Sequence, residues 1–163
     1  MLKKWFDYIE GGPAFTASWG STANPPYQGE DRTMGLQERR KIKELQDVTL
    51  PGRSKEIEEI CGRAIPYEVD WDSLADDMQA LNFLDNLSCH RMNMALRMMC
   101  TDDVSREGVR DGLKLIKLKN VADQKSMKLA FANGVLEMHC AYALGGDGAH
   151  VETAIRDLLL EKL

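Results

Sequence analysis

The clearest structural signal in this chain is SMKLAFANGVLEMHCAY, residues 126–142. Its central Asn133 and Gly134 are the residues that a two-residue type I′ turn prefers, because both turn positions need a positive φ. We therefore predict a β-hairpin over residues 127–131 and 135–142. Pairing Ala132 with Val135 places apolar residues opposite apolar residues on one face: Phe131 with Leu136, Leu129 with Met138, and Met127 with Cys140. A shift of one residue would destroy this match, so the turn and the pattern predict the same register.

The segments around the hairpin predict further strands and two covering helices. Residues 65–71 alternate as in a half-buried strand, and Pro66 favours a sheet edge. Residues 113–121 predict another strand. Residues 73–101 predict a long helix, continuous or broken at Asp85-Asn86, and a last helix ends at Leu163. We expect an α+β fold in which a mostly antiparallel sheet of about four strands packs against the long central helix and the C-terminal helix.

The first third of the chain has a different composition. Residues 1–10 predict a short helix, and residues 11–35 form an irregular arm with five glycines and three prolines. Its aromatic residues Phe15, Trp19 and Tyr27 are expected to anchor the arm on the domain, on a second subunit or on a ligand. A polar helix over residues 36–47 should end before Pro51-Gly52, and Ser54 should cap a short helix to Cys61. We therefore divide the chain into residues 1–53 and an α+β core domain, residues 54–163.

Cysteine and histidine supply the candidate reactive groups. Cys89-His90 and His139-Cys140 are adjacent pairs, and adjacent side chains diverge by about 100° on a helix and point to opposite faces on a strand. At most one member of each pair can therefore reach a common point, so we expect no metal site and no cofactor. A nucleophilic pair of one cysteine and one distant histidine is the remaining catalytic hypothesis. Buried cysteines with a hydrogen-bonded histidine are the structural alternative.

Charge argues against nucleic acid and membrane as partners. The chain has 21 Lys and Arg against 26 Asp and Glu, a net charge of −5, whereas a nucleic-acid coat needs a basic face. Residues 64–103 hold eight acids and two bases, and their carboxylates suit helix caps better than a cation site. Asp7 and Glu10 interrupt any signal peptide, and no run of about 18 apolar residues occurs. We expect a cytoplasmic protein with reduced cysteines.

Surplus apolar surface favours a binding role. The long helix has a second apolar stripe that includes Met94 and Met98, and methionine also serves adaptable binding surfaces. With the arm aromatics, this stripe predicts a homo-oligomer, most simply a dimer. The best hypothesis is a non-catalytic protein-binding or adaptor module. The alternative is a small enzyme whose Cys/His site lies between the sheet and the long helix, using His90, His139, Cys89 or Cys140.

Overall fold

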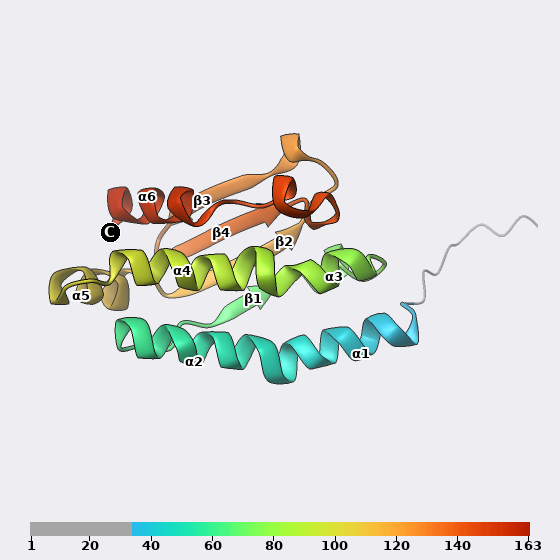
Figure 1. Ribbon diagram of the computed structural model, residues 1–163, viewed down its shortest axis with the longest axis horizontal. Coiled ribbons are helices and arrows are strands. Elements are labelled where there is room, and N and C mark those ends of the chain that lie inside the picture. The colour runs from blue at the N-terminus through green and yellow to red at the C-terminus, as the bar shows by residue number, and fades with distance from the viewer. Residues whose placement is uncertain (1–33) are drawn as a thin grey trace, which may run out of the picture. The chain divides into compact units, whose positions relative to one another are not determined.

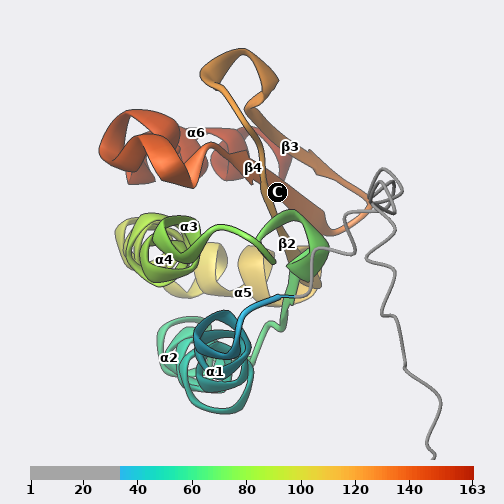
Figure 2. The same cartoon turned by 90° about the vertical axis from the view of Figure 1, so that its right-hand side faces the viewer.

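The computed structural model describes residues 34–163 (Figure 1). The expected N-terminal helix and the arm aromatics Phe15, Trp19 and Tyr27 lie outside this part of the chain. Within it, helices pack in one layer against one face of a four-stranded sheet (Figure 2). The fold is therefore α+β, as the sequence predicts. No helix in residues 34–163 is both long enough and apolar enough to cross a membrane.

The sheet is mixed and mostly parallel, so the prediction of a mostly antiparallel sheet is wrong. Its strands are β1 (Tyr67–Val69), β2 (Leu115–Asn120), β3 (Lys128–Ala132) and β4 (Val135–Cys140), in the order β1-β2-β4-β3. β1 and β2 are parallel because the helices between them return the chain to the same end of the sheet. β3 lies beyond β4 at the far edge, so β4 is the hairpin strand that pairs with β2, in parallel.

The hairpin has the predicted register. Ala132 pairs with Val135, and the ladder continues through Phe131–Leu136 and Leu129–Met138. Asn133 and Gly134 have φ values of 52° and 79°, as a type I′ turn requires. β3 begins at Lys128, so the expected pairing of Met127 with Cys140 is not part of the ladder. The side chains of Leu136, Met138 and Cys140 are fully buried on the face that the helices cover.

One continuous helical segment spans Leu36 to Cys61, so the break expected at Pro51-Gly52 is wrong. It consists of α1 (Leu36–Glu44), the π-helical turn η1 (Leu45–Thr49) and α2 (Leu50–Cys61). Pro51 directly follows the wider π turn, where the N–H of Leu50 bonds to the carbonyl of Leu45, and the helix continues through this proline although it has no N–H to donate. Ser54 caps no helix; its hydroxyl donates to the carbonyl of Ile65 at 2.8 Å. The expected domain boundary, residues 53 and 54, therefore lies within α2.

A second continuous helical segment lies beside the first. It runs through α3 (Met78–Leu84), a π-helical turn η3 (Asp85–Cys89) and α4 (His90–Met99). It is a single helix with a π turn at the position where the sequence suggests a kink. It begins at Met78 instead of Ser73, because Asp70 caps the 3₁₀ turn η2 (Trp71–Ser73) and Asp77 caps α3. The remaining elements are α5 (Asp103–Gly112), η4 (Gln124–Ser126), η5 (Tyr142–Gly148) and α6 (Glu152–Lys162).

Candidate functional site

A groove of about 560 Å³ runs along the edge of the sheet at β1. One side of it is the π turn η1 and the start of α2, and the other side is β1 with the residues next to it. The lining is mainly apolar and comprises Gln46, Leu50, Pro51, Ser54, Pro66, Tyr67, Glu68, Val69, Trp71 and Leu115. The sequence predicts the edge position through Pro66, but the groove itself joins segments that are distant in sequence.

The backbone of β1 presents hydrogen-bonding groups to this groove. Ile116 N donates to Pro66 O at 3.1 Å, and Asp70 N donates to Leu118 O at 2.9 Å. Because alternate residues of a strand direct their backbone groups to the same side, the N–H and C=O groups of Tyr67 and Val69 point away from β2. Among the described residues, β1 pairs with β2 alone. This edge therefore has the geometry that accepts another strand.

A buried polar chain fixes β1 to the helical layer. The Tyr67 hydroxyl donates to Asn93 Oδ1 at 2.7 Å, and Asn93 Nδ2 donates to Glu56 Oε2 at 2.8 Å. Asn93 is only 1% exposed, and burial raises the pKa of Tyr67 well above its ordinary value. Tyr67 is therefore a neutral donor that holds the groove wall in place.

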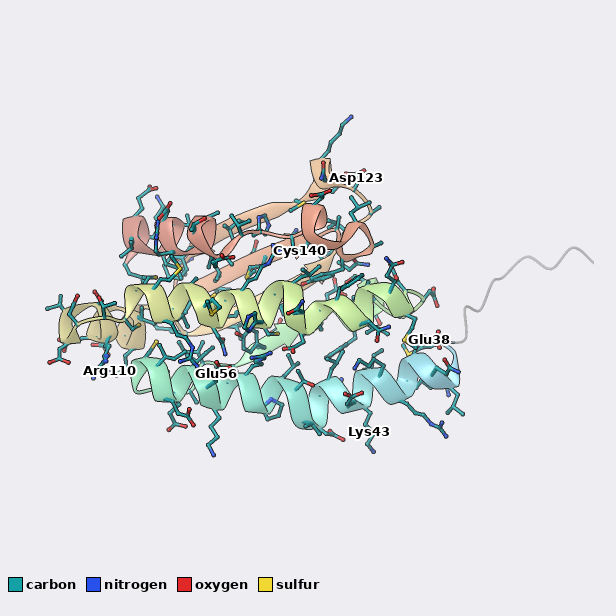
Figure 3. The ribbon with its side chains drawn as sticks, in the orientation of Figure 1. Glu38, Lys43, Glu56, Arg110, Asp123 and Cys140 are labelled. Carbon is teal, nitrogen blue, oxygen red and sulfur yellow. The ribbon has the colours of Figure 1, made fainter. Side chains whose placement is uncertain are left out.

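The same chain ends at Glu56, which lies between the two long helices (Figure 3) and belongs to an ion network there. Arg53 donates to both oxygens of Asp85, at 2.7 and 2.9 Å, and Arg97 donates to Glu56 at 2.6 Å. Chiefly the hydrogen bond from Arg97, with those from Asn93 and Arg53, lowers the pKa of Glu56 to about 2. Because Asp85 opens η3 and Arg53 lies in α2, the network fixes the second π turn against the first helical segment.

The sheet face opposite the helices carries rows of alternating charge. Lys117 pairs with Glu68 and Lys119 with Asp70, each at 3.0 Å, and Lys128 pairs with Glu137. A depression of about 330 Å³ lies on this face and is lined by Glu68, Val69, Asp70, Lys117, Leu118, Lys119, Glu137 and His139. Glu68 and Val69 line both hollows, so β1 is common to the groove and to the charged face.

His139 should make the fold sensitive to mild acid. Partial burial, together with the flanking Lys128 and Lys119, lowers its pKa below the ordinary 6.5. The unfolded chain then binds the proton at a higher pH than the fold does, so stability is lost as the pH falls from about 6.5 through the lowered pKa. We expect the free energy of unfolding, measured with urea, to fall more steeply between pH 7 and pH 5 in the wild type than in His139→Gln. Lys119→Met should shrink this difference, and equal slopes for all three proteins would contradict the prediction.

The structure separates the candidate thiols from the candidate imidazoles. Cys89 is fully buried within η3, whereas His90 is solvent-exposed at the start of α4. Cys140 is fully buried beneath the helices, and His139 lies on the opposite face of the sheet. Burial raises the pKa of both thiols, which disfavours the reactive thiolate. In residues 34–163 no cysteine sulfur is hydrogen-bonded to a histidine ring, and no three His, Cys, Asp or Glu side chains are grouped to hold a metal ion.

The two methionines expected to bind a partner lie on the surface of α4. Met94 is 40% exposed and Met98 is 39% exposed, one helical turn apart. Their role as a contact surface stays a prediction. Comparison with family models, curated proteins and solved structures found no match to this chain. At the β1 edge a mainly apolar groove adjoins backbone groups that point away from β2, and this edge is the candidate site.

Proposed function

We propose that this protein is a non-catalytic binding module that holds an extended segment of a partner protein along the β1 edge. The observation that carries the proposal is the row of outward-facing backbone groups of Tyr67 and Val69 beside a mainly apolar groove. In strand addition, main-chain hydrogen bonds supply affinity and alternate side chains supply specificity. Here inward side chains of the guest would meet Leu50 and Trp71, and outward ones would meet the carboxylates of Glu68 and Asp70.

The neighbour that β1 already has indicates which partner sequence fits. β2 reads Leu115-Ile-Lys-Leu-Lys-Asn120, with Ile116 and Leu118 buried toward the helices and its lysines paired to Glu68 and Asp70. A strand on the other side of β1 meets the same two carboxylates, so alternating apolar and basic residues suit it best. Two β1 edges paired in a homodimer would instead bring like charges together. This charge argument favours a basic partner segment over a second copy at this edge.

The enzyme alternative has no specific observation in its favour, because no cysteine sulfur in residues 34–163 is hydrogen-bonded to a histidine ring. The predicted homodimer stays a proposal that is independent of the groove. Its expected contact is the exposed pair Met94 and Met98 on α4, which lies in the helical layer and not at the edge of the sheet. Binding at the groove and self-association through α4 can therefore be tested separately.

A synthetic peptide with the sequence LIKLKN, a copy of β2, is the direct probe of the groove. We expect it to bind the full chain with a Kd of roughly 10–100 µM, as measured by fluorescence anisotropy, because few residues make the contact. A peptide with both lysines replaced by glutamate should bind about tenfold more weakly, since it places like charges opposite Glu68 and Asp70.

A charge swap separates this site from general electrostatic attraction. The double variant Glu68→Lys/Asp70→Lys should reverse the preference and bind the glutamate peptide more tightly than LIKLKN. Glu137→Lys is the matched control, because Glu137 lies on the same sheet face but two strands away from the edge. It should leave the preference of the wild type unchanged. Equal affinity of the wild type for both peptides, or reversal by Glu137→Lys, would contradict the proposed function.

A further inference from the structure

Two cysteines meet where the two long helical segments end on the same side of the molecule. Cys61 is the last residue of α2, and Cys100 directly follows α4. Their sulfur atoms are 3.1 Å apart. A disulfide has an S–S distance of about 2.05 Å, so the two sulfurs need to approach by only about 1 Å. Both residues end a helix, where the backbone is less constrained than inside one, so a small approach is feasible.

The surroundings of the pair favour ionisation of one thiol. Arg106 Nε donates to the carbonyl of Cys100 at 3.3 Å, which places a positive charge beside this residue. The pKa of Cys100 is lowered, first by a hydrogen bond from Cys61 and also by Arg106, while the pKa of Cys61 is raised. Because the Arg106 guanidinium lies beside Cys100, Cys100 is the sulfur that attacks first and Cys61 is the one that then resolves.

We propose that Cys61 and Cys100 form an oxidisable dithiol that closes to an intramolecular disulfide on reaction with a small disulfide such as oxidised glutathione. The Cys100 thiolate attacks one glutathione sulfur, breaks its S–S bond and releases one glutathione thiolate, which takes up a proton. The Cys61 thiolate, formed by loss of its proton to water, then attacks the Cys100 sulfur of the mixed disulfide and releases the second glutathione. Two protein thiols are oxidised, and one molecule of oxidised glutathione is reduced to two thiols.

Access to the pair needs only a local opening. Cys61 is 2% exposed and Cys100 is 5% exposed, but the residues that follow each of them are exposed, namely Gly62, Arg63, Thr101 and Asp102. Gly62 has a φ of 83° and ends α2, so the segment after Cys61 leaves the helix at once. Movement of these two short segments uncovers the sulfurs without unfolding of the sheet.

The other two cysteines provide an internal comparison. Cys89 and Cys140 are also free and fully buried. Cys140 contacts Ser88 Oγ at 3.7 Å, and in residues 34–163 neither cysteine has a second sulfur as partner. Oxidation should therefore select one pair among the four thiols of the chain. The new bond would join α2 to α4 and close a loop that contains β1 and α3.

The test is oxidation of the full chain by oxidised glutathione, in urea concentrations from zero to just below the unfolding transition. We expect free thiols, counted after denaturation, to fall from four to two. The intact mass should fall by two hydrogen atoms, and peptide mapping should find Cys61 linked to Cys100. The melting temperature should rise by about 10 °C over the reduced protein, because the unfolded chain then carries a cross-link.

Matched single substitutions make the result specific. Cys89→Ala and Cys140→Ala should each still lose two thiols, whereas Cys61→Ser should form no internal bond and should retain glutathione on Cys100. Circular dichroism checks that each variant folds. Retention of all four wild-type thiols at every urea concentration would overturn the proposal, as would a cross-link that includes Cys89 or Cys140.

Discussion

Met138→Asp is expected to abolish folding, whereas His139→Asp, one residue further along β4, should leave the fold intact. Met138 is fully buried against the helical layer, and His139 lies on the charged face between Lys119 and Lys128. An unpaired carboxylate at position 138 costs about 5 kcal/mol or more, which is comparable to the whole stability of a domain. At position 139 the new carboxylate has two lysine neighbours and solvent.

Circular dichroism and urea unfolding measure the two outcomes. Loss of the native far-UV spectrum in Met138→Asp alone would agree with the register of the hairpin. A folded Met138→Asp protein, or an unfolded His139→Asp protein, would show that β4 has its faces reversed. Leu129, opposite Met138, is only partly buried. Leu129→Asp should therefore lower the free energy of unfolding by less than Met138→Asp does, although the sequence pattern alone predicts that both side chains are equally buried.

Gly148→Ala should be the most damaging glycine-to-alanine change within residues 34–163. Gly148 is buried at the end of η5, and a Cβ atom there would overlap the carbonyl oxygen of Ala141 and lie 2.7 Å from its carbonyl carbon. Both are backbone atoms, so no side-chain rotation relieves the overlap. We expect a loss of about 3–5 kcal/mol in the free energy of unfolding, because η5 must shift relative to the end of β4.

Gly52→Ala is the matched control for this substitution. Gly52 lies inside α2, and an added Cβ there has no neighbour within 4 Å. Because alanine favours a helix over glycine, this variant should gain about 0.5–1 kcal/mol in urea unfolding. A Gly148→Ala protein as stable as the wild type would contradict the close approach of η5 to Ala141.

The parts of the fold that depend on neighbouring residues were predictable from the sequence. The Asn133-Gly134 turn and the alternation on each side determine the hairpin register locally, and Pro66 correctly indicates the edge strand. The parallel pairing of β2 with β4 was not predictable in this way. It depends on which edge of the hairpin meets β2, and either hairpin strand has apolar residues for that contact.

The candidate site shows the same division. Cys89-His90 and His139-Cys140 are candidate pairs because they are adjacent in the sequence, but adjacent side chains lie on different faces of a helix or a strand. Cys61 and Cys100 meet only because two helical segments that are distant in sequence end side by side, and no local pattern signals that meeting. The groove likewise depends on a helix that continues through Pro51, where proline suggests a stop.

The two π turns also determine the direction in which the side chains of the following helices, α2 and α4, point. A regular α-helix turns by about 100° per residue, and a π turn holds more residues than the α turn it replaces. If η3 became a regular α-helix with all its residues kept, α4 would rotate by about that angle, so Asn93 would no longer face Tyr67. Loss of one residue from η3 at the same time would cancel this rotation, because the π turn is where the extra residue is held. The extra residue in η1 and in η3 therefore determines which side chains of α2 and α4 face the sheet, and these two turns are the places in the helical layer where loss of one residue disturbs the packing least.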